Sequence, residues 1–215
     1  MDKPKIIYVY DALCGWCYGF SPVIKSVYDF YCDKFEFEVI SGGMILGNQI
    51  GPIGIVAPYI KMAYKTVEEA AGVVFGEAFL KDLEQGETIF SSEMPAVGLS
   101  VFKSYLPEKA VLFAHGLQNG IYFDGKAPAD ESMYRYLAAN FGLDTDEFQC
   151  KMKLEEFKQA AYYDFALAKQ LQVNGFPTVF IQSKDNYFYL ITRGFTDYQT
   201  LEARIENVLT ELATK

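Results

Sequence analysis

The apolar positions at the start of the chain change from a strand pattern to a helix pattern and back. Residues Lys5 to Tyr10 are a short run of β-branched and aromatic residues, which is typical of a buried strand. Apolar side chains then recur at helical spacing and predict a helix with one apolar face: Phe20, Val23, Ile24, Val27 and Tyr31. Pro22 should either kink this helix or mark a restart with Ser21 as its cap. Residues Phe35 to Ile40 alternate as a second strand, so a parallel βαβ unit is predicted.

The middle of the chain is predominantly helical in pattern. Residues 41–58 contain five glycines and predict a long ordered loop, whereas residues 59–172 are almost purely helical. Thr66 and Glu69 form a capping box that should open a helix running toward Phe79. Later helices are expected to begin near Pro95, near Pro107, at Asp130 and at Asp144, the last one running toward Leu171 with one break.

The last part of the chain returns to strand patterns. Residues Thr178 to Gln182 and Tyr187 to Thr192 predict a hairpin, with a turn over 183–186. Thr196 and Gln199 form a second capping box before a final amphipathic helix, whose apolar face carries Leu201, Ile205, Val208, Leu209 and Leu212. The outer parts together predict one four-stranded sheet with helices on both faces. Residues 1–45 and 173–215 would form this α/β domain, and residues 46–172 an inserted, all-helical cap domain.

Composition and charge narrow the classes of function. About half of the residues are apolar (51%), which allows a sizeable core. The net charge is −9, and an acidic surface repels phosphate backbones and anionic lipids, so neither nucleic acid nor membrane is expected as a partner. The apolar run near the start is too short for a secretory signal, so we expect a cytoplasmic protein. In that compartment a close pair of cysteines is more often catalytic or metal-binding than a structural crosslink.

Cys14 and Cys17 lie directly after the first predicted strand, in the first turn of the first predicted helix. Residues three apart share a face of a helix, so the two sulfurs can approach each other. The unpaired N–H groups and partial positive charge of a helix N-terminus favour a thiolate. We expect the pKa of Cys14, nearer the exposed tip, to be lowered, and Cys17 to be more buried and less reactive.

A zinc site is the competing interpretation of the cysteine pair. It would need a second pair of ligands, and the chain offers only His115, Cys32 and Cys150, in no paired arrangement, so we expect no metal. A single helical histidine is usually packed or solvated, and we expect that of His115. Cys32 and Cys150 are expected to behave as small buried hydrophobic residues.

Two motifs carry a family resemblance: Asp11-Ala12-Leu13-Cys14-Gly15-Trp16-Cys17-Tyr18 and Gly175-Phe176-Pro177-Thr178. Together with the long helical insertion, they resemble the DsbA-like branch of the thioredoxin superfamily, and within it the predicted protein-disulfide isomerases related to FrnE. The resemblance implies a thioredoxin fold with a large helical insertion. It also implies a cis-proline at Pro177 beside the cysteine pair, with the backbone of Phe176 open to an extended substrate segment.

The sequence departs from that family in two places near the cysteines. Thioredoxins and DsbA carry a buried acidic group six residues before the first cysteine, where this chain has Tyr8. Asp11 is a candidate proton relay for Cys17 instead. The central dipeptide is Gly15-Trp16, and this dipeptide helps to set the redox potential, so the sequence does not determine the redox direction.

The leading functional hypothesis is a thiol–disulfide oxidoreductase or protein disulfide isomerase, with Cys14 as nucleophile, Cys17 as resolving thiol, and Gly15, Trp16, Phe176 and Pro177 positioning the substrate. It needs no prosthetic group, and glutathione is a candidate co-substrate. The partners would be protein or small-molecule thiols and disulfides.

The alternative enzyme is a glutathione-dependent transferase or isomerase, of the kappa-class or hydroxychromene carboxylate isomerase type. A non-catalytic binding module is the third possibility. The sequence does not determine the natural substrate, the electron donor or the oligomeric state.

Overall fold

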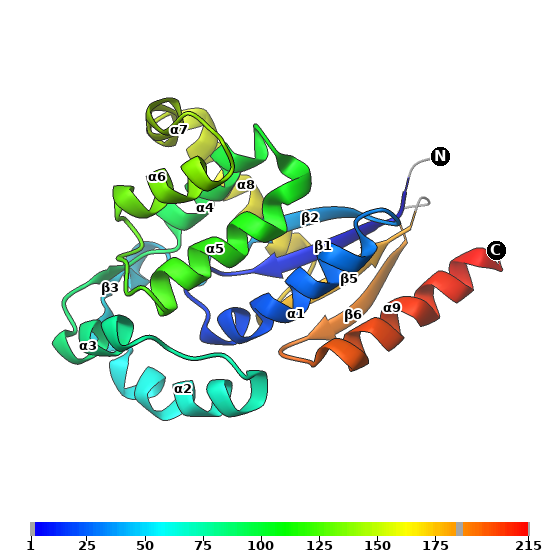
Figure 1. The fold of residues 1–215 in the computed structure, drawn as a ribbon, viewed down its shortest axis with the longest axis horizontal. Coiled ribbons are helices and arrows are strands. Elements are labelled where there is room, and N and C mark those ends of the chain that lie inside the picture. Colours follow the sequence, from blue (N-terminus) through cyan, green and yellow to red (C-terminus); the bar gives the residue numbers. More distant parts are fainter. Residues whose placement is uncertain (1–2, 184–186, 215) are drawn as a thin grey trace.

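A four-stranded sheet forms the centre of the molecule (Figure 1). The structure is a computed structural model that describes residues 3–183 and 187–214. The strands are ordered β2-β1-β5-β6, with bounds β1 Lys5–Tyr10, β2 Glu36–Ser41, β5 Thr178–Gln182 and β6 Phe188–Arg193. β1 pairs in parallel with β2 and antiparallel with β5, and β5 pairs antiparallel with β6. The predicted βαβ unit and C-terminal hairpin are therefore confirmed, while the predicted turn at 184–186 lies outside the described residues.

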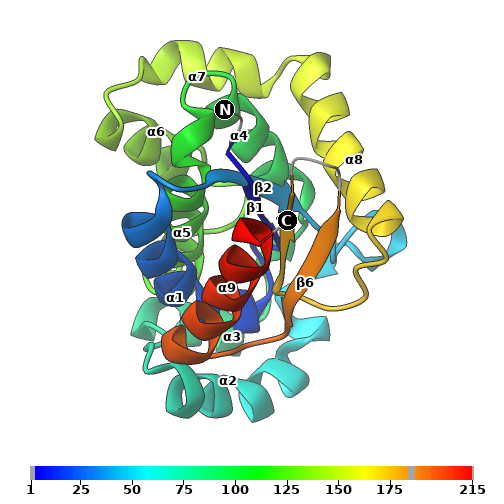
Figure 2. The same cartoon turned by 90° about the vertical axis from the view of Figure 1, so that its right-hand side faces the viewer.

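Helices cover both faces of the sheet, because successive side chains of a strand point to opposite sides. Ile6, Tyr8 and Tyr10 of β1 enter the core under α1 (Gly15–Tyr31) and α9 (Tyr198–Ala213). Ile7 and Val9 point the other way, into a smaller cluster with Ala168 of α8 (Glu155–Gln170). Figure 2 shows the sheet between these two layers. The thioredoxin fold predicted from the sequence is confirmed.

α1 is one continuous helix that contains Pro22. A restart with Ser21 as cap does not occur, because Cys14 already occupies the N-cap position and Ser21 is buried within the helix. Pro22 lies on the exposed side, so the apolar face that packs on the sheet is unbroken. That packing offsets the one backbone hydrogen bond that a proline removes from a helix.

The segment between β2 and β5 contains seven helices and one very short two-stranded sheet. The helices are α2 (Ala57–Ala71), α3 (Glu77–Gln85), α4 (Glu93–Lys103), α5 (Ala110–Tyr122), α6 (Glu131–Asn140), α7 (Thr145–Met152) and α8. The short sheet pairs β3 (Gly51–Pro52) with β4 (Ile89–Phe90), which the helical pattern does not predict. Three single turns of 3₁₀ helix complete it: Gly47–Gln49, Ile53–Ile55 and Pro107–Lys109. One hydrophobic cluster joins these helices to α1 and the sheet, and the division into two domains stays a prediction.

Two predicted helix starts are wrong. Thr66 lies inside α2, which begins at Ala57 with Pro58 in its first turn and ends at Gly72 in the left-handed conformation. Residues 72–76 separate α2 from α3, and the backbone of Gly76 runs so close to Phe123 that a Cβ there would lie 1.8 Å from the Phe123 carbonyl oxygen. At the C-terminal helix the cap is Asp197 rather than Thr196, since the Asp197 carboxylate accepts the N–H of Thr200 at 2.9 Å.

The other predicted helix starts agree with the structure. Asp130 accepts the N–H of Ser132 at 2.8 Å, and Asp144 accepts the N–H groups of Asp146 and Glu147 at 2.9 Å each. The predicted break in the last helical stretch separates α7 from α8 at residues 153–154.

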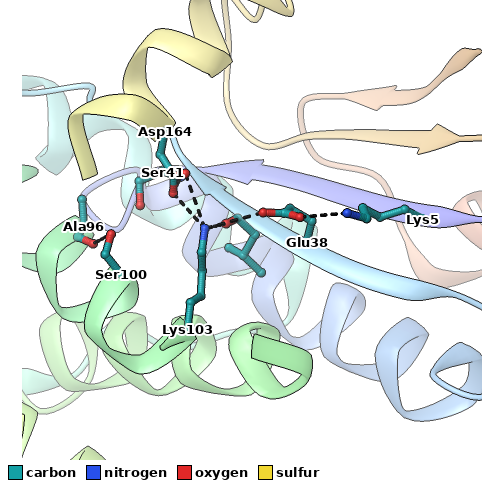
Figure 3. A network of polar contacts seen from close by, with 8 residues as sticks. Lys5, Glu38, Ser41, Ala96, Ser100, Lys103 and Asp164 are labelled. Atoms are coloured by element: carbon teal, nitrogen blue, oxygen red, sulfur yellow. Dashed lines mark hydrogen bonds and ion pairs between the residues drawn. The ribbon is translucent and has the colours of Figure 1, made fainter. Parts of the chain in front are cut away.

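A nearly buried ion network ties the inserted helices to the sheet (Figure 3). Lys103 of α4 donates to the Val39 carbonyl of β2 at 3.0 Å and to the Asp164 carboxylate of α8 at 3.2 Å. The same carboxylate accepts the N–H of Ser41 at 3.3 Å. Burial raises the pKa of Asp164, and the charge of Lys103 opposes that rise. The network therefore holds the end of β2 against α4 and α8.

Candidate active site

Cys14 and Cys17 lie at the N-terminus of α1, directly after β1. Asp11 forms the turn between the two elements: its carboxylate accepts the N–H of Leu13 at 2.9 Å, and its carbonyl accepts the N–H of Cys14 at 3.1 Å. The helix then begins, with the N–H groups of Cys17 and Tyr18 donating to the Cys14 carbonyl at 2.9 and 3.0 Å. The predicted position of the pair at a helix N-terminus is confirmed.

The two thiols differ in exposure and in acidity. Both are free, Cys14 is partly exposed and Cys17 has no exposed surface. A hydrogen bond from Cys17, together with the backbone N–H groups of Cys17 and Trp16, lowers the pKa of Cys14 against the effect of burial. Burial raises the pKa of Cys17 well above its ordinary value, and the neighbouring Cys14 sulfur adds to the rise. Chemically, one accessible thiolate and one shielded thiol in contact can form and exchange a disulfide.

The start of β5 lies against Cys14. The Phe176–Pro177 peptide bond is cis, as the family resemblance implies. The Phe176 carbonyl accepts a hydrogen bond from the Cys14 sulfur at 3.7 Å, although the two residues are 162 positions apart. The Phe176 ring packs on Gly42, where a Cβ would lie 2.1 Å from the ring, so this position needs glycine. Fold topology thus brings the two sequence motifs together.

The surroundings of Cys14 are largely apolar and aromatic. The ring of Trp16 lies 5.9 Å from that of Phe195, and the ring of Tyr18 lies 5.1 Å from those of Phe75 and Tyr122. The Tyr18 hydroxyl donates to the Val74 carbonyl at 2.7 Å, which ties α1 to the segment after α2. Tyr18, Phe75 and Tyr122 are buried, whereas Trp16 and Phe195 are partly exposed.

Asp11 is buried and organises the loops around the pair. One carboxylate oxygen accepts from the Ser92 hydroxyl at 3.0 Å, and the other accepts from the Met44 N–H at 2.7 Å. Burial raises its pKa, and these hydrogen bonds oppose the rise. Among the hydrogen bonds of the described residues, the Asp11 carboxylate makes none to a sulfur. The backbone of Asp11 lowers the pKa of Cys17 through a hydrogen bond and the Asp11 charge raises it, and the proton-relay role stays a prediction.

Two residues near Cys17 were not singled out as site residues by the sequence patterns. Gln118 of α5 is fully buried, and its amide bridges the Cys17 carbonyl at 3.2 Å and the Tyr18 N–H at 3.0 Å in the orientation that satisfies both. A polar residue on the apolar face of residues 110–121 was the available signal. Tyr8 of β1 is also buried, and burial together with the charge of Cys17 raises its pKa, whereas a strand pattern only predicts that its ring is inside.

The other candidate residues lie away from this chemistry or outside the core. His115 is half-buried, its ring nitrogens contact Ser21 Oγ at 2.8 Å and Asn119 Nδ2 at 2.9 Å, and burial lowers its pKa. This packed environment agrees with the expectation.

Cys32 and Cys150 are exposed, so the prediction that they are buried hydrophobic residues is wrong. Cys32 ends α1 and Cys150 lies on the outer side of α7, where the helical pattern gives no information on burial.

Two kinds of feature do not occur within the described residues, 3–183 and 187–214. Within them, no helix combines the length and the apolar character that a membrane span requires. In the same part of the chain, no three side chains of His, Cys, Asp or Glu come together as a metal site would need.

Comparison with known proteins supports the resemblance. The model of the DsbA-like thioredoxin domain family matches residues 108–206, a little under half of the chain. This region runs from the turn before α5 into α9 and includes Phe176 and Pro177, but not the cysteine pair.

Two solved structures have the same fold over nearly their whole length. A putative protein disulfide isomerase from Nitrosomonas europaea is 23% identical with a TM-score of 0.82, and the alignment covers 98% of this chain and 99% of that one. The cytosolic disulfide reductase DsbM from Pseudomonas aeruginosa is 22% identical with a TM-score of 0.77, covering 98% and 100% of the chains. A structure of DsbM with GSH also matches, at a TM-score of 0.77.

A curated relative carries a different description. The ClpXP adapter protein SpxH from Bacillus subtilis is 23% identical over 180 residues, which is 82% of this chain but 58% of the adapter. The chain therefore spans about three fifths of the length of the curated relatives that it matches.

Proposed function

We propose, starting from the DsbA-like thioredoxin fold of this chain, that it is a thiol–disulfide oxidoreductase with Cys14 as nucleophile and Cys17 as resolving thiol. The observation that carries the proposal is the asymmetry of the pair. Cys14 is reachable, has a lowered pKa and touches the Phe176 carbonyl, while Cys17 is enclosed behind it. This is the arrangement that confines attack on a substrate to one sulfur.

In the reducing direction, the Cys14 thiolate attacks one sulfur of a substrate disulfide R–S–S–R′. A Cys14–S–S–R bond forms, and R′S⁻ leaves. Cys17 then attacks the Cys14 sulfur as a thiolate, and its proton leaves with R′S⁻ as R′SH. The Cys14–Cys17 bond forms and RS⁻ departs, so the substrate gains two electrons and the pair loses two. The oxidising direction is the reverse of these steps.

The first turn of α1 and the start of β5 would position the substrate. An extended segment can pair with the backbone of Phe176, next to the cis-proline Pro177. Gly15 and Trp16 lie between the two cysteines and would border this segment, with the Trp16 ring 5.9 Å from that of Phe195. Isomerase activity follows if another thiolate of the substrate attacks the Cys14–substrate disulfide before Cys17 does, so that a new substrate disulfide forms and the Cys14 thiolate is released.

We include glutathione in the proposal as the small-molecule thiol that resets the pair. Two molecules of glutathione would reduce the Cys14–Cys17 bond and leave as their disulfide, which balances the two electrons given to the substrate. The DsbM structure with GSH supports this choice, and a cytoplasmic location is part of the same proposal.

The test is to trap the intermediate in cells. A Cys17→Ser variant should accumulate mixed disulfides through Cys14, visible as bands that disappear on reduction, because the resolving thiol is missing. A Cys14→Ser variant is the matched control and should trap nothing. Absence of mixed disulfides from Cys17→Ser would contradict the proposal.

The glutathione-dependent transferase or isomerase remains the alternative enzyme. Enzymes of that type use one group at the helix tip and do not need a second thiol. The presence of Cys17 in hydrogen-bond contact with Cys14 favours the dithiol mechanism. Glutathione-dependent activity that survives Cys17→Ala would favour the alternative.

A protein-binding adapter is the second candidate function, and the similarity to SpxH favours it. An adapter holds its partner through a surface and does not need a reversible disulfide. A Cys14→Ser/Cys17→Ser double variant would then bind its partner as well as the wild type does. The oxidoreductase proposal predicts that the same variant is inactive in disulfide exchange.

A further inference from the structure

Gln118 of α5 is a polar side chain among apolar neighbours. The buried positions around it on the same helix include Phe113, Ala114, Leu117 and Ile121, and Gln118 itself has no exposed surface. Burying an amide costs free energy unless its oxygen and its NH₂ group both find partners. An apolar side chain in this place would avoid that cost, so the bonds of the amide are the feature to explain.

Both ends of the Gln118 amide bond to the backbone of Cys17 and its neighbour. In the orientation that satisfies both ends, the NH₂ group donates to the Cys17 carbonyl at 3.2 Å and the oxygen accepts the Tyr18 N–H at 3.0 Å. The opposite orientation would leave one long bond, to the Asp11 carbonyl at 3.4 Å. Gln118 thus connects the inserted helices to the first turn of the helix that carries the cysteine pair.

The first turn of α1 has one hydrogen bond fewer to the rest of its helix than the turn of an uninterrupted helix. Within the turn, the N–H groups of Cys17 and Tyr18 donate to the Cys14 carbonyl at 2.9 and 3.0 Å. Pro22 has no N–H that could donate to the Tyr18 carbonyl four residues earlier. The bonds from Gln118 therefore act where the helix itself holds the turn least.

We propose that Gln118 is a positioning residue that holds Cys17 in place for its attack on the Cys14 sulfur. The inference rests on the proposed function and gives the inserted helices a part in its second step. A disulfide needs a sulfur–sulfur distance of about 2.05 Å and a dihedral angle of about 90°, and a fixed backbone reduces the entropy lost in reaching that geometry. Gln118 touches no substrate and transfers no proton.

Cys14 has other contacts, so the first step should not depend on Gln118. The Cys14 N–H donates to the Asp11 carbonyl at 3.1 Å, and its sulfur lies 3.7 Å from the Phe176 carbonyl. With oxidised glutathione as the probe, the Cys14 thiolate attacks one glutathione sulfur, a mixed disulfide forms and one glutathione thiolate leaves. Cys17 then attacks the Cys14 sulfur, its proton goes to a departing glutathione thiolate, and the second glutathione leaves. The probe gains the two electrons that the pair loses.

The experiment mixes reduced full-length protein with oxidised glutathione, stops the reaction with acid at successive times and follows the mixed disulfide and the Cys14–Cys17 bond by mass spectrometry. All proteins carry Cys32→Ser and Cys150→Ser, because those exposed thiols would react as well. Gln118→Met should slow the closing of the Cys14–Cys17 bond by about threefold to tenfold, as expected for one or two lost hydrogen bonds, so the mixed disulfide accumulates. The rate of the first step should stay within about twofold of the wild type.

Gln149 of α7 offers a matched control. It is a buried glutamine, 4% exposed, and its NH₂ group donates to the Glu131 carbonyl at the start of α6 at 3.1 Å. Its amide therefore also connects two helices through a backbone carbonyl, but it does not bond to α1. Gln149→Met removes an amide of the same size from the core and should leave both steps within about twofold of the wild type.

Gln118→Glu separates the hydrogen bonds from the shape of the side chain. At pH 5 burial keeps the new carboxyl group protonated, so its O–H can donate to the Cys17 carbonyl and its C=O can accept the Tyr18 N–H, as the amide does. This variant should close the disulfide within about twofold of the wild type at that pH. Closure as slow as in Gln118→Met would overturn the inference.

The outcomes separate this inference from the proposed function. A wild type that completes both steps while Gln118→Met closes the disulfide equally fast overturns the role of Gln118 alone. Equal slowing of both steps, or slow closure in Gln149→Met, overturns it as well, because either result would report a general loss of packing. A Gln118→Met variant that does not fold would assign Gln118 to stability only and has the same consequence. A wild type that forms neither the mixed disulfide nor the Cys14–Cys17 bond overturns the proposed function and this inference together.

Discussion

At the scale of single residues, two cysteines one helical turn apart have opposite acid–base properties. Cys14 receives hydrogen bonds from Cys17 and from backbone N–H groups, which stabilise its thiolate. Cys17 is surrounded by the core, which disfavours any charge on its sulfur. The sequence predicts this asymmetry from the order of the two residues along the helix. It does not predict Gln118, because this residue comes to the pair from another element.

The reactivity of Cys14 provides the residue-scale prediction. Cys17→Ala removes the first cause of the lowered pKa of Cys14, so that pKa should rise. The iodoacetamide reaction of Cys14 at pH 7 should slow, because less of the thiol is then ionised. The measurement is the pH dependence of the alkylation rate.

The control for this prediction must remove the other thiols. Cys32 and Cys150 are exposed and would react as well, so the comparison is made in a Cys32→Ser/Cys150→Ser background. An alkylation profile of Cys14 that does not change on Cys17→Ala would contradict the assigned cause.

At the scale of secondary-structure elements, local signals predicted most of the boundaries and failed where another element decided. Asp130 and Asp144 cap α6 and α7 as expected, because a cap depends on the next three residues only. α2 instead begins nine residues before Thr66, and the chain turns at Gly76 against the backbone of Phe123. A contact between residues 76 and 123 is invisible to any local pattern.

The Lys103–Asp164 pair gives the element-scale prediction. Lys103→Met leaves the Asp164 carboxylate nearly buried without its cation, which should lower the free energy of unfolding at pH 7 by about 2–3 kcal/mol. Because the pKa of Asp164 is raised in the folded protein, its contribution to stability is fully present below its unfolded pKa and is lost as the pH rises through the folded value. Lys103→Met raises the folded-state pKa of Asp164 further. The free energy of unfolding of the variant should therefore fall more between pH 4 and pH 7 than that of the wild type.

Urea unfolding at several pH values measures this effect. The double variant Lys103→Met/Asp164→Asn is the control, because it removes the charge that Lys103 neutralises. It should be less destabilised at pH 7 than Lys103→Met and should depend less on pH. Equal pH dependence in Lys103→Met and in the wild type would show that the pair does not act through charge.

At the scale of the whole molecule, the inserted helices and the sheet share one hydrophobic core. Gly19 of α1 shows how closely they pack, since a Cβ there would lie 2.8 Å from Val67 of α2. The polar network of Lys103 adds a second connection, from α4 and α8 to β2. The sequence predicts an insertion between the second and third strands of the sheet, but not how much apolar surface joins it to them.

Cooperative unfolding is the prediction at this scale. Trp16 is the only tryptophan and reports on the cysteine pair, whereas the far-ultraviolet circular dichroism comes mainly from the inserted helices. With one shared core, both signals should change at the same guanidinium concentration in the reduced protein. Two separate midpoints would show instead that the insertion unfolds as an independent domain.

By itself, the sequence determined the strand and helix order, most helix starts and the position of Cys14 and Cys17 at a helix tip. These features depend on hydrogen bonds and sterics between residues that are close in the chain. The cis bond before Pro177 was implied by a family resemblance and not by any local pattern. Only the tertiary structure decided the exposure of Cys32 and Cys150, the partners of Asp11, and which groups surround Cys17. Those properties depend on what packs against each side chain, and in this fold the packing partners come from distant segments, as Cys14 and Phe176 show at 162 positions apart.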